Sequence, residues 1–82
     1  MKCTGYFKNT RMRPDRRDIK MEWIERACKN PVKEQKQSDG RIRRWIWIPE
    51  ARKYLRVVLL SDGETLHNAF FDRDFVESQH ED

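Results

Sequence analysis

The chain has 82 residues, which suits one small domain because so short a polypeptide cannot bury two independent cores. Hydrophobic residues make up 37% and charged residues 39%, yet the apolar residues fall in periodic runs, which excludes a disordered polar chain. The net charge of +4 hides an asymmetry, because residues 1–60 carry 17 Lys/Arg against 7 Asp/Glu, whereas residues 61–82 carry one against seven. A basic body favours a polyanionic partner, and a solvated surface is the alternative.

The first part of the chain predicts a short strand at residues 3–8, a basic loop at 9–17 and then a helix. From Asp18 onward the apolar residues recur every three to four positions, which is the period of an α-helix. This stripe consists of Ile19, Trp23, Ile24, Ala27 and Cys28. Asp18 is expected to cap the helix N-terminus, and Asn30-Pro31 ends the helix because proline cannot continue its hydrogen-bond ladder.

The remaining residues predict antiparallel strands. Residues 32–37 are typical of an edge strand, and Ser38-Asp39-Gly40 predicts a turn into a strand at residues 41–48. Two further strands, residues 54–60 and 64–71, flank Asp62-Gly63, a dipeptide that favours a two-residue hairpin turn. The sequence therefore predicts an α+β fold, with one main amphipathic helix packed on one face of an antiparallel sheet of about four strands. We expect the domain to span residues 1–75, followed by an acidic tail at 76–82.

The turn at Asp62-Gly63 sets the expected register of the last hairpin. A two-residue loop pairs Leu59 with Leu66, Val58 with His67, Arg56 with Ala69 and Tyr54 with Phe71. A matching hairpin between residues 48 and 54 places Trp45 opposite Arg56 and Arg43 opposite Val58. One face then packs on the helix, with Arg44 as an exception. The residues expected to be buried together are Trp23, Ile24, Cys28, Ile42, Ile46, Leu55, Val57, Leu59 and Phe70.

The second face of this sheet gathers cations, aromatic rings and one imidazole. Its expected members are Arg43, Trp45, Trp47, Tyr54, Arg56, His67 and Phe71. Such a surface suits single-stranded RNA, because arginine meets phosphate with a fixed fork of donors and bases stack on exposed rings. Trp45, Trp47 and Tyr54 are the candidate stacking residues. The alternative is a second small core beneath the N-terminal segment or the acidic tail, since large aromatic side chains seldom lie bare.

His67 is the candidate acid or base for cleavage of RNA by its own 2′-hydroxyl, because an imidazole exchanges protons near neutral pH. Arg56 is expected diagonally beside it, and Arg56 and Arg43 are the candidate phosphate ligands, with Arg73 in support. A structural histidine on a strand is the alternative.

Two further segments have expected roles at the same surface. The basic run at residues 11–17, with Arg13, Arg16 and Arg17, either steers phosphate toward the helix N-terminus or is solvated and paired with Asp15 and Asp18. In the acidic end, Phe75 is expected to pack against the Tyr54–Phe71 edge. Glu77, Glu81 and Asp82 would then lie near the basic face, and a frayed terminus is the alternative.

The sequence gives no sign of metal or cofactor chemistry. Cys3 and Cys28 lie far apart, without a CxxC pair or a nearby histidine, and a packing role is expected for Cys28. No glycine-rich phosphate loop, GxSxG or HExxH motif is present. No apolar run approaches the roughly 20 residues that span a bilayer, and residues 1–10 lack the apolar stretch of a secretory signal. We therefore expect a cytoplasmic protein with no metal, cofactor or membrane partner.

Two segments, "DGRIRRW" (Asp39–Trp45) and "KYLRVVLLSDGETLHNAFFDR" (Lys53–Arg73), resemble an uncharacterised family of small bacterial proteins grouped with the RelE/ParE and BrnT-like toxin superfamily. The resemblance covers residues 6–75 and implies a RelE-like architecture. It also implies an endoribonuclease of a toxin–antitoxin pair that cleaves messenger RNA without a metal. If the basic, aromatic face is instead a protein interface, its expected ligand is an acidic antitoxin segment. Arg43, Arg56, His67 and Arg73 occupy places comparable to the active residues of such toxins. The alternative is a non-catalytic domain that binds nucleic acid or protein.

Overall fold

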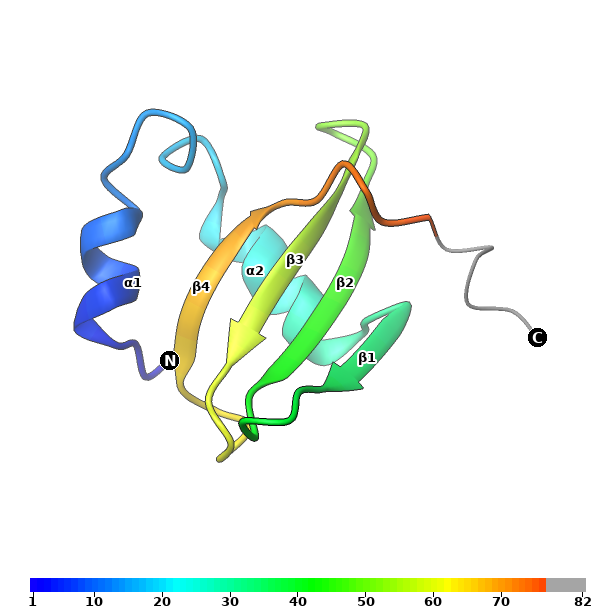
Figure 1. Cartoon of the computed structure of the whole chain (residues 1–82). Helices are drawn as coiled ribbons and strands as arrows, with labels where there is room; N and C mark the ends of the chain where they lie inside the picture. Colours follow the sequence, from blue (N-terminus) through cyan, green and yellow to red (C-terminus); the bar gives the residue numbers. More distant parts are fainter. Residues whose placement is uncertain (77–82) are drawn as a thin grey trace.

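The computed structural model describes residues 1–76 and has the expected α+β architecture. Its elements are α1 (Gly5–Thr10), α2 (Met21–Lys29), β1 (Lys33–Lys36), β2 (Ile42–Ile48), β3 (Lys53–Leu59) and β4 (Leu66–Phe71). The four strands form one antiparallel sheet in the order β1-β2-β3-β4. Helix α2 covers one face of this sheet, and α1 lies beside the edge strand β4 (Figure 1). No helix in the described part of the chain is long and apolar enough to cross a membrane.

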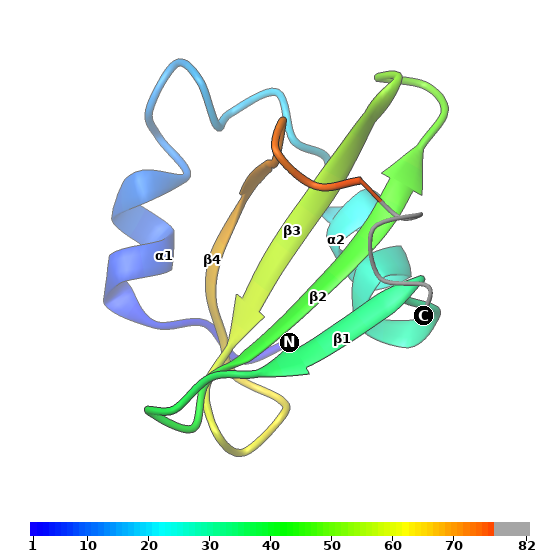
Figure 2. The ribbon, with the colours of Figure 1, turned by 45° about the vertical axis from the view of Figure 1, so that its right-hand side comes forward.

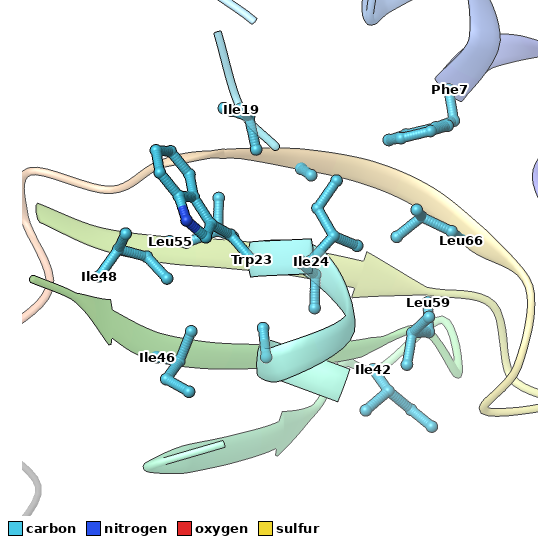
Figure 3. Packing of buried hydrophobic residues seen from close by; sticks show 13 residues of the cluster. Phe7, Ile19, Trp23, Ile24, Ile42, Ile46, Ile48, Leu55, Leu59 and Leu66 are labelled. Carbon is cyan, nitrogen blue, oxygen red and sulfur yellow. The ribbon is translucent and has the colours of Figure 1, made fainter. Parts of the chain in front are cut away.

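The main core lies between α2 and the sheet, as the helical stripe predicts (Figure 3). Phe7 reaches this core from α1, and Ile19 reaches it from the loop before α2. The remaining buried members are Trp23, Ile24, Ala27, Ile42, Ile46, Ile48, Leu55, Val57, Leu59, Leu66 and Ala69. Cys28 packs against this cluster while remaining partly exposed.

The start of α2 differs from the prediction. The helix begins at Met21 with Lys20 as its N-cap, and no side chain caps it, so the expected cap at Asp18 is wrong. The physical reason is a series of tight turns in the preceding loop. The amide of Arg17 bonds the carbonyl of Arg13, and that of Ile19 bonds the carbonyl of Arg16. Ile19 thereby enters the core without being helical. The helix ends at Lys29, as the Asn30-Pro31 pair predicts.

Residues 3–8 do not form the expected strand, because Thr4 starts a helix instead. The Thr4 hydroxyl accepts a hydrogen bond from the amide of Phe7, which satisfies one of the unpaired donors of the first helical turn. Only a short bridge precedes α1. In this bridge the amide of Thr4 donates to the carbonyl of Leu66, and the amide of Leu66 donates to the carbonyl of Lys2.

Arg44 is the one cation of β2 on the face that α2 covers, and it has two partners there. Its Nε donates to the Glu34 carboxylate at 2.6 Å, and its Nη1 donates to the Cys28 carbonyl at 3.0 Å. Helix C-termini expose carbonyls without intrahelical partners and carry partial negative charge, so a cation is favourable at this position.

The register of β2 on β3 confirms the prediction, but that of β3 on β4 does not. Leu59 pairs with Leu66 as expected, and then Asn68 instead of His67 pairs with Val58. His67 is therefore an extra residue, a β-bulge, and every later side chain of β4 changes face. The unbulged register would bury the Asn68 amide under α2, which is costly without hydrogen-bond partners.

The bulge changes the expected positions of three residues that follow Asn68. Phe70 leaves the core and faces Arg56, whereas Phe71 leaves the second face and packs against the α2 core. Ala69 likewise turns toward the core and pairs with Val57.

Replacing Leu55 by alanine tests this core, because the side chain is fully buried at the centre of the sheet. We expect Leu55→Ala to lower the free energy of unfolding in urea by about 2–5 kcal/mol, from lost burial and the cavity left behind. Val32→Ala is the control, since Val32 is 42% exposed, and it should change this free energy by less than about 0.5 kcal/mol. Equal effects of the two variants would contradict the described packing.

Candidate nucleic-acid interface

The sheet face opposite α2, called here the open face, carries side chains from all four strands. Neither helix of the described chain crosses it, since α2 lies behind the sheet and α1 lies at its edge (Figures 1 and 2). Alternation along the paired strands assigns its members, which are Lys33, Gln35, Arg43, Trp45, Trp47, Tyr54, Arg56, Val58, Asn68 and Phe70. The open face therefore joins basic, aromatic and amide groups.

Phe70 lies at the centre of an arginine cluster on this face. The Cζ of Arg56 lies 4.4 Å from the centroid of the Phe70 ring, and the Cζ of Arg16 lies 5.2 Å from it. Both distances are within the range of cation–π attraction. Arg16 also donates to the Asn68 side-chain oxygen at 2.7 Å. One member of the basic loop thus reaches the sheet, whereas Arg13 and Arg17 are exposed on the connection between α1 and α2.

A hollow of about 570 Å³ opens beside this cluster, and we call it the arginine hollow. Its lining includes Gln35, Arg43, Trp45, Arg56, Phe70, Asp72, Arg73, Asp74 and Phe75. When the Gln37 side-chain oxygen faces Arg43, it accepts a hydrogen bond from Arg43 Nη2 at 2.7 Å. Arg73 is exposed, with no hydrogen bond or ion pair inside residues 1–76. Three of the four sequence-predicted catalytic residues, all arginines, therefore line one hollow.

Arg56 is partly buried in the hollow, and one of its donors has no hydrogen-bond partner among the described residues. This donor is the buried Nε. The nearest carboxylate oxygen, of Asp72, lies 3.6 Å from its Nη1. Burial lowers the pKa of Arg56, the Asp72 carboxylate raises it, and the charge of Arg43 lowers it further. The Arg56 side chain is 25% exposed, so the accessible part of its guanidinium can donate to an anion in the hollow.

After β4 the chain crosses the open face toward β2, and we call residues 72–76 the strap (Figures 1 and 2). Asp72 fixes the beginning of the strap to the sheet. The Asp72 amide donates to the Tyr54 carbonyl, and its carboxylate accepts from Trp45 Nε1 at 2.9 Å and from the Asp74 amide at 3.0 Å. The same residue therefore fixes the strap, the indole and the neighbouring Arg56.

The strap covers Trp45 with the ring of Phe75. The two rings stack with centroids 4.9 Å apart and 15° between their planes, and the Phe75 ring meets that of Tyr54 at 4.8 Å and 66°. Trp45 is only 4% exposed, so no base can stack on it while Phe75 is in place. The prediction that Trp45 is a stacking platform for bases is therefore wrong, and Trp45 instead belongs to a second small core with Phe75 and Tyr54. The expected packing of Phe75 is confirmed for Tyr54, and Glu77, Glu81 and Asp82 lie outside the described residues.

His67 does not join the arginine hollow, because the bulge moves it along β4. Phe70 faces Arg56, so the expected diagonal contact between His67 and Arg56 is wrong. The imidazole instead stacks on the Tyr6 ring at 4.9 Å, and its Nδ1 lies 3.0 Å from the Thr4 hydroxyl. This hydroxyl also accepts from the amide of Phe7, and it can donate its own proton to Nδ1 when the imidazole carries its proton on Nε2. Burial and the charge of Arg41 both lower the pKa of His67.

Asn68, Phe70 and Asp72 are the site residues that the sequence interpretation missed. The polarity of Asn68 is a usable signal, since an amide beneath α2 would lack partners. Nothing in the sequence marks Asp72 as the residue that binds the Trp45 indole. No group of three or more His, Cys, Asp or Glu side chains in residues 1–76 is placed to hold a metal ion.

The chain was compared with models of known protein families, with curated proteins and with solved structures, and none of the three comparisons finds a match. The function of the open face must therefore be inferred from its own geometry.

Asp72→Ala tests the anchoring of the strap. This variant removes the acceptor of the Trp45 indole and leaves a buried donor unpaired, so we expect the free energy of unfolding to fall by about 1–3 kcal/mol. Acrylamide should also quench tryptophan fluorescence more strongly, because Phe75 covers Trp45 less tightly. Asp74→Ala is the control, since only its backbone amide contacts Asp72. Unchanged quenching in Asp72→Ala would show that Asp72 does not hold the strap.

Proposed function

We propose that this protein binds single-stranded RNA through the open face, with the arginine hollow as its phosphate site. The observation that carries the proposal is Arg56, a partly buried guanidinium whose side chain is 25% exposed, next to a second arginine in the same hollow. Phosphate oxygens accept the parallel donors of an arginine fork, and phosphodiesters supply such oxygens at every nucleotide.

An exposed aromatic ring favours a single strand over a duplex. Trp47 is 41% exposed on the same face, and aromatic rings bind nucleic acid by stacking on unpaired bases. Sequence-specific and single-stranded RNA recognition uses such rings together with arginine planes, whereas duplex RNA hides its base faces in the helix. Arg16, above Phe70, extends the cationic surface toward β4.

Fluorescence anisotropy with a labelled single-stranded RNA oligonucleotide tests this proposal. Arg56→Gln should weaken binding and lower the slope of log affinity against log salt by about one, because one phosphate contact is lost. Arg26→Gln removes the same charge from α2, where Arg26 pairs with Glu50, and serves as the matched control. An Arg56→Gln protein with the affinity and salt slope of the control would overturn the phosphate site.

A metal-independent endoribonuclease of toxin–antitoxin type is the second candidate function. It is favoured by the imidazole of His67, whose Nδ1 lies 3.0 Å from the Thr4 hydroxyl and whose pKa is lowered by burial and by the charge of Arg41. The positive charge next to this imidazole comes from Arg41, not from Arg56, so cleavage would take place at the α1 side of the open face. Messenger RNA bound in the arginine hollow would have to extend to this side.

Incubation of the protein with RNA in EDTA separates binding from cleavage. If His67 is the acid or base, His67→Ala should reduce cleavage by about 100-fold or more while RNA affinity stays within twofold. Products are read on a denaturing gel, and Arg26→Gln again serves as the control for charge. Undiminished cleavage by His67→Ala would contradict this mechanism. If the unaltered protein does not cleave RNA, RNA binding remains as the only proposed function.

An acidic protein segment, such as an antitoxin, is the competing partner. The strap already makes such contacts within the chain, with a carboxylate beside Arg56 and an aromatic ring on Trp45. The carboxylates of such a partner would pair with the arginines of the open face. Its binding should therefore weaken strongly as the salt concentration increases.

A further inference from the structure

A second, smaller cleft lies where the strap passes the ends of β2 and β3, and we call it the aromatic cleft. Its volume is about 280 Å³, just below the roughly 300–1,000 Å³ of common ligand pockets, so it suits a compact ring system. Its lining comprises Trp47, Arg52, Lys53, Tyr54, Phe71, Asp72, Arg73 and Phe75. Aromatic walls with a cationic rim are the two features that distinguish it.

We infer that the aromatic cleft holds one unpaired nucleobase of the bound RNA, stacked on Trp47, with the phosphate of that nucleotide on Arg73. This inference rests on the proposed function, since it assigns a base site next to the phosphate site of the same strand. The ligand chemistry is a planar heteroaromatic ring with an attached phosphate.

Trp47 is built to act as a platform. It is 41% exposed, whereas Trp45, two residues earlier on the same face, is covered by Phe75. The Trp47 ring meets the Tyr54 ring at 5.0 Å and 64°, an edge contact that fixes its orientation and leaves ring surface in solvent. A preoriented ring loses little conformational entropy when a base stacks on it.

Arg73 connects the two sites. It lines both the aromatic cleft and the arginine hollow, and it has no ion pair within the described residues. A phosphodiester at Arg73 would therefore have its base on one side, at Trp47, and the next phosphate on the other side, at Arg43 and Arg56. Arg52 adds charge to the rim from a turn in which its φ is +55°, a rare conformation for a residue other than glycine.

The test compares two polyanions that differ in the presence of bases, namely a single-stranded RNA oligonucleotide and inorganic polyphosphate. Trp47→Ala should weaken RNA binding about fivefold or more, the usual effect of losing one base–aromatic stack. Its polyphosphate affinity should stay unchanged, because no charge is removed. Trp47→Phe keeps a ring and should recover most of the RNA affinity. Val32→Ala removes an apolar side chain of similar exposure just before β1 and should alter neither affinity.

Each outcome decides between the two sites. Equal losses for RNA and polyphosphate in Trp47→Ala, or no loss for either, overturn the base site. A normal urea transition for Trp47→Ala ensures that the loss does not reflect unfolding. If the alanine variant is unstable, Trp47→Leu provides the same comparison, because it removes the ring and keeps an apolar side chain of intermediate size. If Trp47→Ala weakens RNA binding while Arg56→Gln does not, the base site stands and the proposed phosphate site falls. The reverse result leaves the phosphate site and removes the base site.

Discussion

The extra residue at His67 decides what the open face contains. Without this bulge, Phe70 would pack under α2 and Arg56 would face Ala69, so the cation–π contact of the arginine cluster would not exist. The bulge costs one ladder position in β4 and keeps the Asn68 amide out of the core. Asn68 then orients Arg16 beside the same ring. A backbone irregularity on an edge strand thus creates the basic site and separates His67 from it.

Asp72 is the second constraint, because it connects the strap to the sheet at three points. Its carboxylate is 14% exposed and lies between the Trp45 indole and the Arg56 guanidinium. A buried carboxylate of this kind lowers the net charge of the hollow while holding the arginine in place. The consequence is a face with two regions. Trp45, Tyr54 and Phe75 form a closed aromatic core, whereas Trp47 and the arginines stay accessible to solvent.

The sequence predicts the features that depend on hydrophobic period and misses those that depend on single tertiary contacts. The alternation of Ile42, Ile46 and Ile48 shows which side chains of β2 face the core. Once these are known, the register of β2 on β3 follows from the length of the connecting turn. The bulge could not be read from Asp62-Gly63, since the turn pairs Leu59 with Leu66 correctly and the slip comes one residue later. The residues around Thr4 are typical of a strand, and only the structure shows that the Thr4 hydroxyl caps α1. Likewise, the exposure of Trp45 and Trp47 differs only because a residue far along the chain covers one of them.

The arrangement of Arg56 favours anion binding in a way that its charge alone does not. A flexible arginine on a surface loses rotamer entropy and hydration when it meets a phosphate. In this protein the guanidinium is already partly desolvated and rests on the Phe70 ring, so part of that cost is met during folding. Asp72 opposes binding, since a phosphate must share Arg56 with its carboxylate 3.6 Å away. A ligand that also contacts Arg43 and Arg73 overcomes this competition more easily than an isolated anion, which favours a polymer with regularly spaced phosphates.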